Sequence, residues 1–308
     1  KQTHCWLAAR EQLRQRRPGV LVQRSHGWEP RAEETLKEWR RVFGLRDRQG
    51  WRAVPGRFVD RRLAQHARWS VRYAAGTIVS CSQDRDYLLA AYGVPGDRVA
   101  CIPQAAAPIF RQTPPAPWSP ARLKHLLYVG NFSYAKGIHA VGQAAATLLE
   151  LDPEATFTWI VPAADRESAL GMFPPAVRSR VRAEPWTSQA ELAHVYDRHG
   201  VFLFPSLFEG FGKVFLEAMA RGLCVVGTPT GGMRDVLRPG ANGALVPFNS
   251  AADVVAAVRN WWSHPEQAAR VSAAAAQTAA AHSWERVAAE TESFYEKLLS
   301  QPSGRRTP

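Results

Sequence analysis

The sequence predicts an α/β protein built on parallel sheets, and three observations support this fold class. Short apolar runs alternate with helical patterns along most of the chain. Two of these runs end in a glycine loop that opens into a helix, within residues 126–138 and 201–220. A proline-rich stretch, residues 111–122, separates two such series and predicts an interdomain linker. The 308 residues are enough for about two domains.

The first series precedes the proline-rich stretch. Its strands are expected at residues 20–22, 77–80 and 98–102, and its helices at 5–17, 33–43, 61–73 and 83–92. In the second series, strands are expected at 125–129, 156–161, 201–204, 223–226 and 244–246. Its helices are expected at 137–149, 188–197, directly after Gly212, at 251–262 and at 265–281. The predicted domains are residues 1–113 and 114–285, followed by a C-terminal helix and frayed tail, residues 286–308.

Composition excludes several classes of protein. With 46% hydrophobic and 21% charged residues, the chain can bury a core in each domain and is not disordered as a whole. No run approaches the roughly 18 apolar residues of a membrane-spanning helix. The four cysteines, at positions 5, 81, 101 and 224, show no paired spacing for zinc or a disulfide framework. We therefore expect no metal site and a reducing, cytoplasmic setting.

Positive charge is concentrated in the first half of the chain. Residues 1–113 hold 21 Lys and Arg against 10 Asp and Glu, whereas residues 114–308 hold 18 against 17. A basic half of this kind suits an anionic membrane or an acidic acceptor, so the protein could lie peripherally at a membrane. An Arg-rich genome would produce the same bias. Nucleic acid is disfavoured because no recognised binding motif accompanies the charge.

Residues 201–235 carry the most informative pattern. The apolar run Val201 to Phe204 is followed by a loop with Gly210 and Gly212, and then by a helix and a second apolar run. The N–H groups at the start of that helix, near Gly212 and Lys213, lack acceptors and favour an anion such as a diphosphate. This segment therefore predicts a phosphate site at the carboxyl end of a strand.

Two acidic residues accompany this phosphate site. Glu209 lies on the loop and Glu217 on the helix, eight positions later. Carboxylates repel phosphate, so we expect them to accept hydrogen bonds from the hydroxyls of a ribose and a sugar ring. Together these features suggest a nucleotide sugar. The alternative is that Glu209 only caps the helix and that Glu217 faces solvent.

A second glycine turn contributes a cation. In LLYVGNFSYAKGI, Gly130 ends a strand, and Lys136 lies near the start of the next helix, where it could reach a diphosphate. An ordinary surface lysine is the alternative. His26 follows the first strand, and a lone histidine in a loop is more often structural or solvated than catalytic.

The string from PS through EGFG and LEAMA to GTPTGG resembles the signature of family 4 glycosyltransferases, which have the GT-B fold. The resemblance spans residues 20–299 and is strongest over 120–299. It implies two Rossmann-like domains facing a cleft, with the N-terminal one truncated in this chain. The implied reaction is retaining transfer of a sugar from a UDP- or GDP-sugar to the hydroxyl of a glycan, a lipid-linked acceptor or a small molecule. Neither a metal nor a cofactor is implied.

The resemblance also assigns roles to residues. Glu209 would contact the donor sugar, Glu217 the ribose and Lys136 the departing diphosphate, while His26 would lie close to the transferred sugar. The other expected donor-binding positions are Gly130, Asn131, Gly210, Phe211, Gly212, Lys213 and Val214.

Three departures from the family pattern leave other readings open. Asn131 stands where the family usually has Arg, and Pro103-Gln104-Ala105 where it has Pro-Asn-Gly. The part before Val20 is too short for the family's first strand and glycine loop, so we expect that the chain is a fragment. A nucleotide-sugar-binding relative without catalysis is one alternative. An epimerase that converts the nucleotide sugar without an acceptor is the other.

Overall fold

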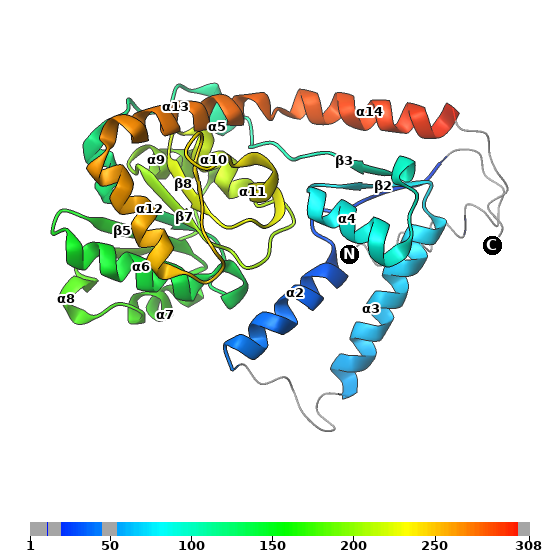
Figure 1. The fold of residues 1–308 in the computed structure, drawn as a ribbon, viewed down its shortest axis with the longest axis horizontal. Helices are drawn as coiled ribbons and strands as arrows, with labels where there is room; N and C mark the ends of the chain where they lie inside the picture. Colours follow the sequence, from blue (N-terminus) through cyan, green and yellow to red (C-terminus); the bar gives the residue numbers. More distant parts are fainter. Residues whose placement is uncertain (1–10, 12–19, 45–53, 301–308) are drawn as a thin grey trace. The chain divides into compact units, whose positions relative to one another are not determined.

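The computed structural model describes residues 11, 20–44 and 54–300 (Figure 1). The chain divides into two compact units. The N-terminal unit runs to Pro103 and also takes in the chain from Glu285 onward, and the C-terminal unit is Gln104–Trp284. Apart from Glu11, the helix expected at residues 5–17 lies outside the described residues.

The N-terminal unit contains a parallel sheet in the order β1-β2-β3. Its strands are β1 (Val22–Arg24), β2 (Gly76–Val79) and β3 (Val99–Cys101), and its helices are α2 (Glu29–Val42), α3 (Val54–Tyr73) and α4 (Ser82–Tyr92). The last helix of the chain, α14 (Trp284–Ser300), packs on this unit. Its Phe294 and Leu298 side chains lie so close to Gly76 that a Cβ there would meet them at 2.7 Å.

The C-terminal unit contains a six-stranded parallel sheet in the order β6-β5-β4-β7-β8-β9. Its strands are β4 (His125–Val129), β5 (Thr156–Val161), β6 (Val181–Pro185), β7 (Val201–Phe204), β8 (Cys224–Gly227) and β9 (Ala244–Leu245). Its longer helices are α6 (Ile138–Leu151), α9 (Gln189–Asp197), α10 (Lys213–Ala220), α12 (Ala251–Ser263) and α13 (Pro265–Ala281).

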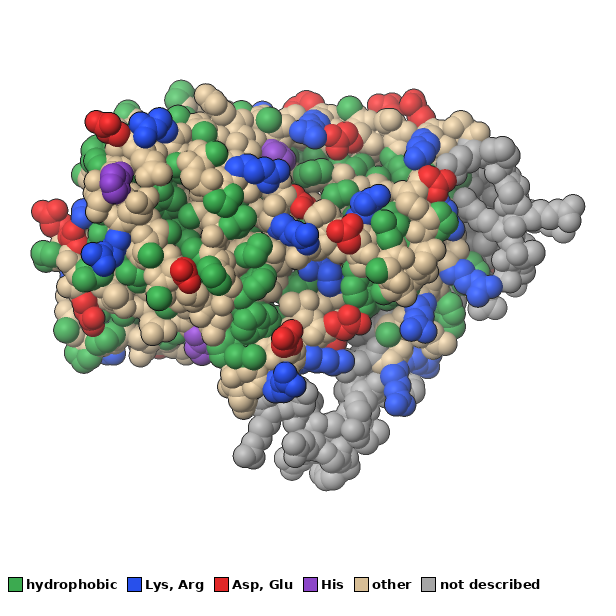
Figure 2. Space-filling model, viewed as in Figure 1, with side chains coloured by type: hydrophobic (Ala, Val, Ile, Leu, Met, Phe, Trp, Pro, Cys, Tyr) green, Lys and Arg blue, Asp and Glu red, His purple; other side chains and the backbone are tan. Residues whose placement is uncertain are grey.

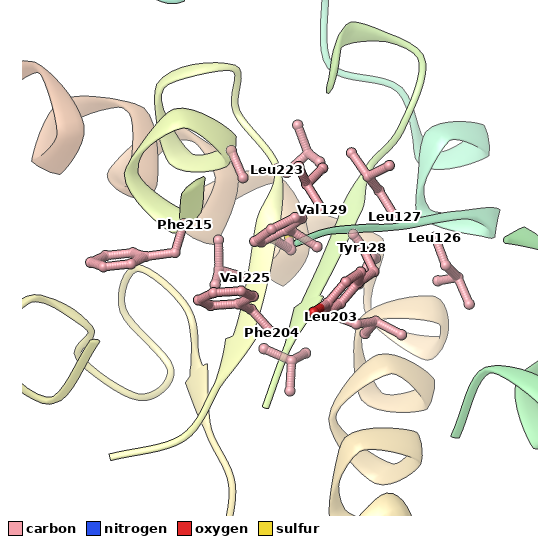
Figure 3. Packing of buried hydrophobic residues seen from close by; sticks show 14 of the residues in the cluster. Leu126, Leu127, Tyr128, Val129, Leu203, Phe204, Phe215, Leu223 and Val225 are labelled. Carbon is pink, nitrogen blue, oxygen red and sulfur yellow. The ribbon is translucent and has the colours of Figure 1, made fainter. Parts of the chain in front are cut away.

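Helices cover both faces of this sheet. The β4-α6-β5 and β7-α10-β8 crossovers step in opposite directions along the sheet, and right-handed crossovers then place α6 and α10 on opposite faces. Helix α12 packs with α6, and α13 packs with α10 (Figure 1). Central strands of such a sheet are buried on both sides, which explains the unbroken apolar runs of β4 and β7. Figure 3 shows this packing, in which the Tyr128 and Phe204 rings of neighbouring strands lie 6.2 Å apart.

Several elements were not expected from the sequence. Strand β6 is an edge strand whose side chains alternate between buried and exposed positions, so it lacks the apolar run that identified the other strands. The remaining unexpected elements are short helices: α5 (Ile109–Gln112), α7 (Arg166–Gly171), α8 (Pro175–Arg178) and α11 (Gly231–Val236). Within the described part of the chain, no helix is both long enough and apolar enough to cross a membrane.

The prediction that residues 111–122 form an interdomain linker was wrong, because this stretch is bound to the C-terminal unit. The Arg221 guanidinium, 2% exposed, donates to the carbonyls of Thr113 and Pro114 at 2.8 and 3.0 Å. It also forms two bonds to the Asp197 carboxylate, at 2.8 and 2.6 Å. The boundary between the units accordingly lies at Pro103 rather than at residue 113.

Candidate functional site

The C-terminal sheet has one topological switch point, between β4 and β7. From β4 the chain adds β5 and β6 on one side, then returns to add β7, β8 and β9 on the other. The loops that leave the carboxyl ends of β4 and β7 therefore diverge, and ligands of open α/β sheets bind in the crevice between such loops. Both glycine loops singled out from the sequence are at this point.

The two loops are bound to each other through their backbones. The Leu207 N–H donates to the carbonyl of Ala135 at 2.9 Å. Gly137 has a left-handed backbone, with φ of 70°, and a Cβ at this position would lie 2.0 Å from the Pro205 carbonyl oxygen. Only glycine allows this close approach, so the two loops are held together in backbone contact.

The candidate residues Lys136 and Glu209 meet between these loops. Lys136 Nζ lies 2.6 Å from Glu209 Oε1, and the Ser206 hydroxyl donates to the same oxygen at 2.9 Å. Glu209 is 5% exposed, and the Glu209 N–H donates to the Thr230 hydroxyl at 3.3 Å. Glu209 is thus a buried, paired carboxylate, and the alternative of a simple helix cap does not describe it.

Helix α10 begins at this loop. Gly212, with φ of 89°, precedes the helix, and the N–H groups of Lys213 and Val214 belong to its first turn, where a helix offers them no acceptor. The Phe211 side chain is buried and packs on Phe215 with ring centroids 5.6 Å apart. Since that anchor fixes the loop, the helix start presents backbone donors to an anion.

Glu217 lies one turn further along α10 and is 7% exposed, so the alternative that it faces solvent was wrong. The Tyr196 hydroxyl donates to Glu217 Oε2 at 3.3 Å. Burial raises the pKa of the Glu217 carboxyl, and the positive charge of Lys213 and the Tyr196 hydrogen bond oppose this rise. A buried carboxylate of this kind suits hydroxyl donors better than phosphate oxygens.

The loop after β4 is held from beneath by a tyrosine. Tyr128 is fully buried in β4, and its hydroxyl donates to the Asn131 carbonyl at 3.0 Å. A Cβ at Gly130 would lie 2.7 Å from that hydroxyl oxygen. The Asn131 side chain is exposed.

Sequence reasoning missed Ser206, Thr230 and Tyr196. Ser206 was visible in the strand-ending Pro-Ser pair, but its bond to Glu209 depends on how the loop turns. Thr230 comes from the loop after β8 and accepts from the Glu209 N–H, and Tyr196 comes from α9 and donates to the Glu217 carboxylate. No spacing in the sequence links either residue to its partner.

His26 belongs to the N-terminal unit, where it is exposed in the loop that follows β1. The end of this loop is bound to α4: the Trp28 N–H donates to Asp84 Oδ2 at 3.0 Å, and Arg31 Nε to Oδ1 at 2.6 Å. Asp84 is fully buried. The loop carrying His26 is therefore held at one end by a buried ion pair.

The described residues contain no group of three His, Cys, Asp or Glu side chains that could hold a metal ion. The residues at the switch point offer polar chemistry: the cations Lys136 and Lys213, two buried carboxylates and the donors of a helix start.

Residues 123–264 match the family model of the glycosyl transferases group 1. The matched residues run from β4 to α12 and include Lys136, Glu209 and Glu217. The C-terminal unit thus contains a region similar to group 1 glycosyltransferase domains. Among curated proteins, a D-inositol 3-phosphate glycosyltransferase of Thermobispora bispora is 29% identical over 246 residues, or 75% of this chain and 56% of that protein. The chain spans about half the length of the curated relatives that it matches.

Solved structures show the same fold. A sucrose-phosphate synthase from Thermosynechococcus elongatus has a TM-score of 0.73 at 22% identity, covering 96% of this chain and 72% of that one. Anabaena Alr3699/HepE, solved in complex with UDP and glucose, has a TM-score of 0.69 at 17% identity, with 98% and 76% covered. The chain thus has the GT-B fold, as expected from the sequence.

Proposed function

We propose that this chain belongs to a retaining, metal-independent glycosyltransferase that uses a nucleotide sugar, and that its C-terminal unit binds this donor. The observation that carries the proposal is the Lys136–Glu209 pair at the switch point, beside the start of α10. Cation, carboxylate and helix donors in one crevice suit a ligand with both phosphate and hydroxyl groups. The structurally similar HepE was solved with UDP and glucose, which carry phosphate and hydroxyl groups.

Each part of the donor has a complementary group in the domain. The diphosphate would lie at the first turn of α10, where the N–H groups of Gly212, Lys213 and Val214 and the helix dipole favour negative charge. Glu217 would accept hydrogen bonds from the ribose hydroxyls, and Glu209 from hydroxyls of the donor sugar. The backbone of Gly210 and Phe211, and that of Gly130 and Asn131 in the facing loop, would line the same crevice.

Lys136 has a partner before the donor arrives, since its ammonium group lies against Glu209. On binding, the ammonium would turn toward the diphosphate, and Glu209 would exchange it for sugar hydroxyls. Each group leaves one charge-assisted contact and gains another, so the exchange costs little. During transfer the Lys136 charge would stabilise the departing diphosphate. The acceptor hydroxyl would attack from the same face and give its proton to the phosphate.

The N-terminal unit would supply the acceptor side. His26, exposed at the carboxyl end of β1, would approach the transferred sugar. The acceptor is a glycan, a lipid-linked molecule or a small molecule, and the excess of Lys and Arg in residues 1–113 suits contact with an anionic membrane.

Calorimetric titration with UDP, GDP, ADP and their sugars tests this proposal. One nucleotide should bind, and Glu217→Ala should weaken it by about tenfold or more, because a hydrogen bond to a charged group contributes about 1.5–3 kcal/mol. Glu154→Ala is the matched control, since Glu154 is exposed in the turn before β5, at the opposite edge of the sheet. If no nucleotide binds to the folded protein, or if both variants weaken binding equally, the proposed donor site is wrong.

A binding protein without catalysis is the second candidate, and the exposed side chain of Asn131 favours it. An amide at this position supplies no positive charge to a departing diphosphate. A chain that binds the nucleotide sugar but neither hydrolyses nor transfers the sugar would support this candidate. Gain of turnover in Asn131→Arg would identify the missing cation as the cause.

A further inference from the structure

The N-terminal unit contains a cavity of about 380 Å³ between the ends of α3 and α4. It is lined by three arginines, Arg68, Arg72 and Arg98, together with Tyr92 and the backbone turn at Gly93 and Val94. None of the described residues that line it is acidic. Its volume is at the lower end of the range for small-molecule sites, roughly 300–1,000 Å³.

The arginines differ in how they are held. Arg98 is fixed in the wall of the cavity, because its guanidinium donates to the carbonyls of Ala74 and Ala75, directly after α3. Arg68 and Arg72 are one turn apart on α3, and both are exposed. Within the described ranges of the chain, neither has an ion-pair partner. Two like charges one helical turn apart repel each other, so an anion between them would relieve a cost that the free protein bears.

The cavity lies away from the edge of the sheet where the unit carries His26. Arg98 directly precedes β3, and Ala75 directly precedes β2. In a parallel sheet these positions mark the amino-terminal edge, whereas His26 follows β1 at the carboxyl edge. Reactions in open α/β folds take place at carboxyl edges. A ligand in this cavity would therefore lie at the edge of the sheet opposite His26.

The surface of α3 carries further positive charge. On the face drawn in Figure 2, Lys and Arg side chains predominate over the region of α3. Guanidinium groups match phosphate oxygens with paired N–H donors and stay charged at all physiological pH values. Arginines around a small hollow, with no carboxylate in its lining, match a compact dianion better than a neutral sugar.

From this geometry we propose that the α3–α4 cavity is a binding site for a phosphate monoester, held by Arg68 and Arg72 together with the fixed Arg98. The phosphate could belong to a free small molecule or to the headgroup of a lipid. Both sources present the same dianion, and the experiment distinguishes them.

Calorimetric titration with inorganic phosphate tests the site. The variant pair Arg68→Gln and Arg72→Gln should bind phosphate at least about tenfold more weakly than the unchanged protein, because two charge-assisted contacts are lost. The control pair is Arg41→Gln and Arg61→Gln, exposed arginines of α2 and α3 outside the cavity, which removes the same net charge. It should stay within about twofold. Circular dichroism confirms that both variants are folded.

Vesicle sedimentation separates the two sources. Vesicles of phosphatidylcholine with phosphatidic acid carry a monoester headgroup, and vesicles with phosphatidylglycerol carry only a diester. Preferential binding to phosphatidic acid, competed by inorganic phosphate, identifies a lipid headgroup. Binding of phosphate without binding to either vesicle identifies a free ligand. No phosphate binding by the unchanged protein, or equal loss in both variant pairs, would overturn the proposal.

Discussion

Replacing Tyr196 by Phe should change how donor binding depends on pH. The Tyr196 hydroxyl donates to Glu217 Oε2 at 3.3 Å, and both side chains are buried. Phe fills the same space and keeps the edge contact with Phe110, at 5.7 Å. The variant therefore removes one hydrogen bond from the Glu217 carboxylate, along with a 3.4 Å contact to the Val214 carbonyl, and leaves the packing in place.

The magnitude follows from the length of that bond. Hydrogen bonds to charged groups contribute about 1.5–3 kcal/mol, and this one is longer than the ~2.5–2.7 Å of a strong O–H···O⁻ bond. We take about 1.5 kcal/mol, which corresponds to about one pKa unit. Burial already raises the pKa of Glu217, so loss of the hydroxyl should raise it further, by about one unit.

The sign follows from which form binds. Ribose hydroxyls donate to the ionised carboxylate, so affinity should fall as the pH is lowered through the pKa of Glu217. In Tyr196→Phe this fall should begin about one unit higher. Calorimetry with a UDP- or GDP-sugar measures it, because the diphosphate diester does not titrate near neutral pH.

Tyr128→Phe is the control, because it also removes a buried hydroxyl but one that donates to the Asn131 carbonyl rather than to Glu217. Its pH midpoint should match that of the unchanged protein. Equal midpoints for Tyr196→Phe and the unchanged protein would refute the role given to this hydrogen bond.

Two further predictions concern stability. Burial lowers the pKa of His199 to about 4, so its neutral form stabilises the fold above its ordinary pKa of about 6.5. That contribution, about 3 kcal/mol, is lost as the pH falls from about 6.5 toward 4. In His199→Gln, calorimetric unfolding should show a weaker loss of stability over this pH range. The exposed control His194→Gln should behave as the unchanged protein does. An equal dependence of stability on pH in His199→Gln and the unchanged protein would contradict the assignment. Gly137→Ala should lower the free energy of unfolding by more than about 2 kcal/mol and weaken nucleotide binding, because its Cβ would force the Pro205 carbonyl away. Gly171→Ala, where a Cβ meets nothing within 4 Å, should not destabilise, and a fully stable Gly137→Ala protein would show that the loops tolerate separation.

Much of the fold was predictable because the central strands of a parallel sheet appear in the sequence as continuous apolar runs. Val201 to Phe204 and Leu126 to Val129 are buried apolar runs, since both faces of a central strand are covered. Edge strand β6 was not predicted because one of its faces is exposed, and the short helices α7 and α8 were missed because one or two turns carry no periodicity. The interpretation of residues 111–122 as a linker was wrong. Prolines indicate a stiff backbone, but they do not indicate that Arg221 binds the carbonyls of this stretch.

The sequence by itself predicted the α/β class, the two glycine loops and three candidate donor-binding residues, Lys136, Glu209 and Glu217. Local spacing and residue type carry that information. Only the tertiary structure decided that Lys136 and Glu209 are paired, that Tyr196 holds Glu217 and that Arg68, Arg72 and Arg98 share one cavity. Each of these contacts joins segments from different crossovers or helices. Strand order brings them together, and strand order depends on how sheets and helices pack rather than on any spacing along the chain.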